Sequence, residues 1–154
     1  IQLHGGGKIT LAQVNEIRKI VARKLRSYGR QFPNEFYIQI NRLNGWTKPA
    51  DLLYLKPPIV ARFTNEIIYA RFSKEILPIL QQMNPYIGWC VRAHKHFQRL
   101  TDDGQKQLQI FIEDAIEVMK ECTTWYEFRV KHAAKFGLSV QLGLWENNNS
   151  LPTA

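Results

Sequence analysis

Residues 101–121, TDDGQKQLQIFIEDAIEVMKE, combine a helix-start signal with apolar side chains at helical spacing. Thr101 can cap the first turn, and Asp102 and Asp103 carry negative charge where the helix dipole favours it. The apolar stripe is broad and consists of Leu108, Phe111, Ile112, Ala115, Ile116 and Met119. We therefore predict a mainly α-helical domain whose longest helix begins near Thr101 and ends near Glu121.

Similar patterns elsewhere predict a single compact domain of about five to six helices. The expected helices cover residues 10–28, 34–43, 60–72, about 74–83, 101–121 and about 125–136. Gly29 can end the first helix, Ser73 can cap the fourth, and Thr123 or Thr124 can cap the last, which Gly137 ends. Residues 86–100, YIGWCVRAHKHFQRL, fit neither period and are expected to form an irregular basic loop, with room for a short strand or turn.

The ends of the chain differ in composition from its middle. Residues 1–9 contain three consecutive glycines and are expected to be a linker or a trimmed boundary of a longer protein. The helical domain is expected over residues 10–144, and a disordered tail over residues 145–154. Cys90 and Cys122 are far apart in sequence, which is typical of a reducing, cytoplasmic environment. No apolar run is long enough to cross a membrane, so no membrane partner is expected.

Positive charge is the feature that bears most on the partner. The chain has 21 Lys and Arg against 13 Asp and Glu, a net charge of +8, which favours a polyanion such as nucleic acid. Four cations recur at steps of four, three and four on the expected first helix: Lys19, Arg23, Arg26 and Arg30. Such a row is either a solvated outer face or a stripe that follows phosphates.

The basic loop is the second candidate for binding. Its polar candidates are Arg92, His94, Lys95, His96 and Arg99, and the aromatic residues Trp89 and Phe97 lie among them. Cations mixed with aromatic rings suit phosphates and stacked bases, and they also suit a partly buried surface loop. A structural zinc site usually shows two tight ligand pairs, whereas this chain has one loose cluster in this loop, Cys90, His94 and His96. We therefore predict no metal and no cofactor.

Four segments, in order, resemble those of the phage P-sixty-three C-terminal domain family. They read FPNEFYIQINRLNGW, KPPIVARFTNEIIYARFSKEILPILQQMNP, HKHFQRLTDDG and TWYEFRVKHAAKFG, and the resemblance extends over residues 31–144. One family motif, Thr-Asn-x-x-x-Tyr, is matched by Thr64, Asn65 and Tyr69. Another joins a His-x-His segment to a Leu-Thr-acid-acid-x-Gly segment, and its matches are His94, His96, Leu100, Thr101 and Gly104.

The resemblance implies an accessory part of a phage or prophage regulatory protein, grouped with antirepressor-like modules. Where the family continues its histidine segment, this chain reads Phe97, Gln98 and Arg99, which argues against a catalytic histidine array. The chain also lacks a nucleophile elbow and a phosphate-binding glycine loop. We expect a non-enzymatic domain that binds nucleic acid through the basic helix and loop. The alternatives are a domain that binds a protein partner or a second copy, and a metal nuclease that uses His94 and His96.

Overall fold

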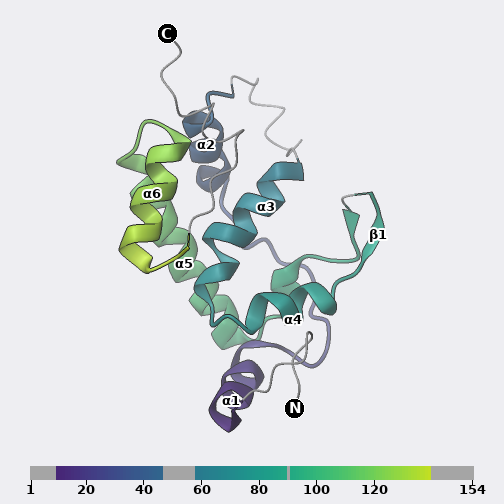
Figure 1. Ribbon diagram of the computed structural model, residues 1–154. Coiled ribbons are helices and arrows are strands. Elements are labelled where there is room, and N and C mark those ends of the chain that lie inside the picture. Colours follow the sequence, from purple (N-terminus) through teal and green to yellow (C-terminus); the bar gives the residue numbers. More distant parts are fainter. Residues whose placement is uncertain (1–9, 47–57, 90, 140–154) are drawn as a thin grey trace.

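The computed structural model describes residues 10–46, 58–89 and 91–139, so the expected linker and tail lie outside the described residues. Its elements, with η for a 3-10 helix, are α1 (Leu11–Ile20), α2 (Asn34–Leu43), α3 (Pro58–Ile67), η2 (Tyr69–Arg71), α4 (Ile76–Gln82), β1 (Tyr86–Gly88), β2 (Val91–Arg92), η3 (His96–Arg99), α5 (Asp102–Lys120) and α6 (Trp125–Phe136). The mainly α-helical prediction is confirmed (Figure 1).

Helix α5 is the element on which three other helices assemble. It packs against α1, α2 and α6, and the side chains of Leu108, Ile112 and Met119 are completely buried. Its start agrees with the sequence prediction, because the Thr101 hydroxyl accepts a hydrogen bond from the Gly104 backbone N–H at 3.1 Å. A side-chain cap of this kind satisfies one of the unpaired N–H groups of the first turn.

Aromatic side chains fill the space between α2, α3, α5 and α6. Phe36, Phe63 and Phe128 are among the largest fully buried side chains. Trp125 lies between two of these rings, with centroid distances of 4.4 Å to Phe63 and 5.0 Å to Phe128. Burial of such rings is a large source of stability. The apolar face of α3, formed by Val60, Phe63 and Ile67, therefore belongs to the core, as its helical period predicts.

Arg71 is a half-buried cation at the edge of this core. Its guanidinium group lies 3.8 Å from the ring centroid of Phe136 and 4.3 Å from that of Phe111. It also donates to the Asp114 carboxylate at 2.6 Å. Two aromatic faces and one carboxylate compensate for the water that this cation loses on burial.

The prediction of one long helix over residues 10–28 is wrong, because α1 ends at Ile20. Val21 has an extended backbone, with φ −98° and ψ 123°, and it forms an antiparallel bridge with Leu100. The apolar spacing continues past Ile20, but the backbone there takes its partners from a distant segment. Tertiary pairing overrides the local helical period at this point.

Two other helix boundaries also differ from the predictions. Helix α3 ends at Ile67, and the separate 3-10 turn η2 continues the chain. Ser73 does not cap α4, because a backbone turn intervenes and α4 begins at Ile76. In that turn the Ile76 N–H donates to the Ser73 carbonyl oxygen at 2.9 Å, so the serine backbone takes part instead of its hydroxyl.

The carboxyl end of α1 meets the start of α5 at very short range. The Thr101 N–H donates to the Ile20 carbonyl oxygen at 2.8 Å. A Cβ atom at Gly104 would lie 2.6 Å from that same oxygen and 3.1 Å from the Leu100 Cβ. The Leu-Thr-acid-acid-x-Gly motif thus has a physical reason, since its glycine leaves room for α1 and its threonine holds α1 in place.

Candidate nucleic-acid interface

The two basic segments singled out in the sequence lie side by side. The Ala22 N–H donates to the Arg99 carbonyl oxygen at 2.7 Å, and the Arg26 N–H donates to the Gln98 carbonyl oxygen at 2.9 Å. The side chain of Gln98 adds a bond from Nε2 to the Arg26 carbonyl oxygen at 3.1 Å. The Arg99 guanidinium donates to the Arg23 carbonyl oxygen at 3.3 Å. We call residues 19–30 together with 92–99 the basic junction.

The predicted cations differ in whether their side chains already pair with other groups of the protein. Lys19, Arg23 and Lys95 are exposed, and their side chains form no ion pair within the described part of the chain. These three residues can therefore meet a phosphate without first breaking a bond to an acidic group. They are the best-placed members of the predicted set.

Arg26 and Arg30 already take part in the fold. Arg26 donates to the Leu100 carbonyl oxygen at 2.9 Å and to the Asp102 carboxylate at 2.5 Å. Arg30 donates to the Phe32 carbonyl oxygen at 3.2 Å and to the side chain of Asn34. Because the helix ends at Ile20, these arginines do not form the predicted helical stripe. Their side chains instead connect the non-helical segment after α1 to the start of α5 and to the start of α2.

Asn84 positions the loop that carries the second basic segment. It is completely buried, and its side chain donates to the His94 carbonyl oxygen at 2.7 Å and accepts from the His94 N–H at 3.0 Å. Its amide nitrogen also lies 3.1 Å from Nδ1 of His96. Asn84 is not among the candidate residues predicted from the sequence, so its role in the loop was missed.

Arg92 is held at the base of the hairpin formed by β1 and β2. Its guanidinium donates to the Asn84 carbonyl oxygen at 2.8 Å and to the Tyr86 hydroxyl at 3.2 Å. The same group lies 4.1 Å from the centroid of the Tyr86 ring. Arg92 is partly exposed, so it can still present positive charge while it fixes the hairpin.

The two histidines of the loop are not cations at neutral pH. His96 is buried, and desolvation, with a smaller effect from the positive charge of Arg92, lowers its pKa to about 4. Desolvation also lowers the pKa of His94, helped by Arg99. His96 therefore serves the fold as a neutral ring.

The Tyr69 position of the Thr-Asn-x-x-x-Tyr motif supports the loop directly. The Tyr69 ring is buried and meets the His96 ring edge-on, with centroids 5.3 Å apart. Burial raises the pKa of the Tyr69 hydroxyl, so it stays protonated. Thr64 bonds within its own helix, from Oγ1 to the Val60 carbonyl oxygen at 2.8 Å. Asn65 is partly buried and has no hydrogen bond to the loop in the described part of the chain.

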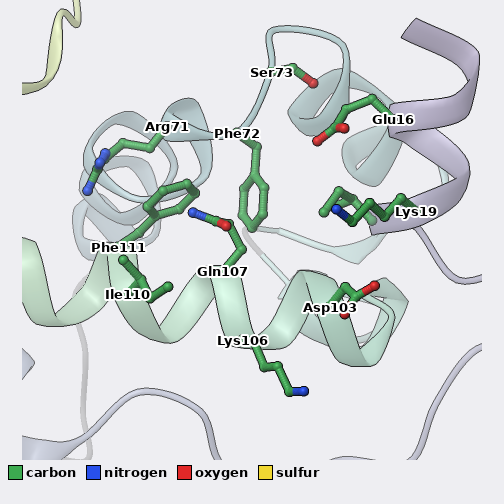
Figure 2. A pocket seen from close by; sticks show the side chains of 11 residues that line it. Glu16, Lys19, Arg71, Phe72, Ser73, Asp103, Lys106, Gln107, Ile110 and Phe111 are labelled. Carbon is green, nitrogen blue, oxygen red and sulfur yellow. The ribbon is translucent and has the colours of Figure 1, made fainter. Parts of the chain in front are cut away.

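A polar hollow of about 440 Å³ lies next to the junction, between α1 and α5. Figure 2 shows Glu16 and Lys19 on α1 opposite Asp103 on α5, with Arg71 farther along the wall and the side chain of Lys106 directed away from α1. Charges of both signs line it, so its chemistry does not select an anion. We assign no ligand to this hollow.

Residues 10–46, 58–89 and 91–139 show neither a cluster of metal ligands nor a membrane-spanning helix. No group of three His, Cys, Asp or Glu side chains there could hold a metal ion. Cys90, one member of the loose cluster in the sequence, lies outside the described residues. None of the helices in these ranges is long and apolar enough to cross a bilayer.

Comparison with known proteins gives one family. The model of the P-sixty-three-C domain matches residues 17–108, which starts before and ends before the resemblance found over residues 31–144. The matched range includes the last turn of α1, the whole loop and the first turns of α5, whereas the segment TWYEFRVKHAAKFG lies beyond it. No curated protein and no solved structure matches the chain. Because the family model covers more than half of the sequence, the chain belongs to the P-sixty-three-C domain family.

Proposed function

We propose that this phage-type domain is a non-enzymatic regulatory module that binds nucleic acid through the basic junction. The observation that carries the proposal is the distribution of charge along the two joined segments. Residues 17–34 contain six Lys or Arg and residues 76–101 contain three, and neither segment contains any Asp or Glu. Backbone hydrogen bonds bring these acid-free segments together, so their positive charges add at one place on the surface.

The neighbouring acidic groups do not cancel this charge. Glu75 and Asp102 flank the second segment directly. Among the described residues, Asp102 pairs with Arg26, and the Glu75 carboxylate accepts a hydrogen bond from the side chain of Gln13. Lys19, Arg23 and Lys95 remain exposed. Lysine and arginine side chains in this state bind phosphates and release the counterions that surround the nucleic acid. The family supports a role in a phage-derived regulator, in which binding of nucleic acid would be the contribution of this domain.

The test is the salt dependence of duplex binding. Fluorescence anisotropy with a labelled duplex DNA would be recorded at several salt concentrations for the native chain and for the triple variant Lys19→Gln, Arg23→Gln and Lys95→Gln. Three lost phosphate contacts should reduce the slope of log K against log salt by roughly 2.7. Circular dichroism of both proteins would show that the fold is unchanged.

A matched control removes the same charge from another part of the surface. Lys120, Lys131 and Lys135 are exposed and belong to the end of α5 and to α6. Their triple change to glutamine leaves the same net charge as the first variant, and it should leave the slope nearly unchanged. Equal effects of the two variants on the slope would mean that binding depends on the net charge of the protein and not on the position of the charges. Absence of binding by the native chain at low salt would refute the proposed function.

A further inference from the structure

The hairpin formed by β1 and β2 presents a group of large apolar side chains to solvent. Tyr86 is 63% exposed, Ile87 70%, Trp89 86% and Val91 52%. The hairpin lies at the edge of the molecule, on the side opposite to α6 (Figure 1). An exposed group of large apolar residues at one site marks a binding surface more often than single scattered ones do.

Hydrogen bonds and a ring contact anchor the base of this hairpin to the rest of the fold. The Ala93 N–H donates to the Pro85 carbonyl oxygen at 2.9 Å, and Arg92 bonds to the Asn84 carbonyl oxygen and covers one face of the Tyr86 ring. A two-stranded hairpin has little stability of its own in water. The contacts of Arg92 with buried Asn84 therefore stabilise the hairpin. The apolar side chains of the hairpin stay exposed to water, which is unfavourable for them in the absence of a partner.

We propose that this hairpin binds single-stranded nucleic acid by stacking an unpaired base on Trp89, while Arg92 and Lys95 contact the adjacent phosphates. The inference rests on the proposed function and specifies its ligand. An indole ring gives a broad stacking face that accepts any base, and nearby cations follow the backbone. In a duplex, each base already stacks on its neighbours and offers only its edges. Trp89 therefore needs an unpaired base.

The charge around the hairpin favours this ligand over a second copy of the chain. Residues 76–101 contain no Asp or Glu, and Arg92 and Lys95 follow the apolar residues of the hairpin closely in sequence. A symmetric pair of hairpins would bring these cations next to their own copies, and like charges at an interface disfavour association. A polyanion with flat apolar bases complements both the charge and the exposed ring.

The experiment compares Trp89→Ala with the native chain on three labelled probes of equal length: an oligothymidylate, an oligouridylate and a DNA duplex. Loss of one stacking platform should weaken binding to a single strand by about 10-fold or more. Affinity for the duplex should change less than about twofold, because the duplex offers no unpaired base. Trp89→Phe should recover most of the lost affinity, and Tyr126→Ala, an exposed aromatic position on α6, should have no effect.

The outcomes separate this inference from the proposed function. If the native chain binds the duplex, and Trp89→Ala loses no more affinity for single strands than for the duplex, the inference is overturned and the proposed function stands. No binding of any probe by the native chain would refute both. A concentration-dependent dimer in light scattering that Trp89→Ala abolishes would overturn the inference and assign the hairpin to a second copy. A loss on either single strand supports the inference, and the strand that the native chain binds more tightly is the preferred ligand of the two.

Discussion

Replacing Gly104 with alanine should destabilise the contact between α1 and α5. The added methyl group would lie 2.6 Å from the Ile20 carbonyl oxygen and 3.1 Å from the Leu100 Cβ. Both distances are shorter than a normal carbon contact, and the closer neighbour is backbone, which cannot turn aside as a flexible side chain can. The end of α1 must therefore move, and the hydrogen bond from the Thr101 N–H to the Ile20 carbonyl oxygen lengthens with it.

The magnitude follows from two destabilising contributions and one stabilising contribution. Inserting a methyl group into a filled site costs about 1–3 kcal/mol, and the loss of a good hydrogen bond adds about 1 kcal/mol. Alanine recovers up to about 1 kcal/mol, because it favours a helix interior more than glycine does. The free energy of unfolding should fall by roughly 2 kcal/mol, which corresponds to a decrease in Tm of about 4–8 °C for a chain of this size.

Urea denaturation followed by far-ultraviolet circular dichroism would measure this change. Gly29→Ala is the control, because a Cβ atom there has no heavy atom within 4 Å, and it should be neutral or stabilising by up to about 1 kcal/mol. If Gly104→Ala unfolds at the same urea concentration as the native chain, the close approach of α1 to α5 is refuted.

Three other substitutions or conditions test separate parts of the fold. His96 and His132 are buried and their pKa values are lowered to about 4, chiefly by desolvation. Below about pH 6.5 the unfolded chain therefore binds more protons than the folded chain. The free energy of unfolding should decrease by about 2 kcal/mol for each of the two histidines between about pH 7 and pH 5. Equal urea midpoints at the two pH values would contradict this. Asn84→Ala should lower the free energy of unfolding by about 2–3 kcal/mol, because it leaves buried hydrogen-bonding groups of the loop without partners. Hydrogen exchange of the His94 amide should become measurably faster. Gly137→Ala should cost about 1 kcal/mol in urea denaturation, because the residue ends α6 with a φ of 69°; an unchanged midpoint would show that this end can relax.

Helices with local start and stop signals were predictable from the sequence. The Thr101 cap begins α5, and Thr124 caps α6 by accepting a hydrogen bond from the Glu127 N–H at 3.1 Å. Gly137 ends α6 in the left-handed conformation. Each signal depends on residues within one or two turns of the chain, so its effect does not require knowledge of the rest of the fold.

The first helix shows where such reasoning fails. The apolar period runs on to Tyr28, but the chain leaves the helix at Val21 because Leu100 and Arg99 supply backbone partners. Nothing near Val21 in the sequence indicates these partners. The predicted basic residues of the two segments come together nonetheless, through strand-like pairing in place of a helical stripe.

The candidate site was predictable by composition and not by geometry. Cations and aromatic rings in residues 86–100 drew attention to the loop, and the short strands there agree with the irregular pattern. The burial of His96 and the central role of Asn84 depend on contacts with η2 and α4, which no local pattern encodes. Histidines that look like ligands in a sequence can thus be neutral supports in the fold.

The pairing of the two basic segments also sets the moment at which the surface can arise during folding. Arg23 and Arg99, joined by a hydrogen bond, are 76 positions apart in the chain. A growing chain on the ribosome therefore holds the first set of cations long before their partners have been synthesised. Closing a loop of this length is entropically costly and belongs among the slower events of folding. A chain in which this loop is still open carries the same charges but lacks their arrangement, so the ability to bind would report that folding is complete.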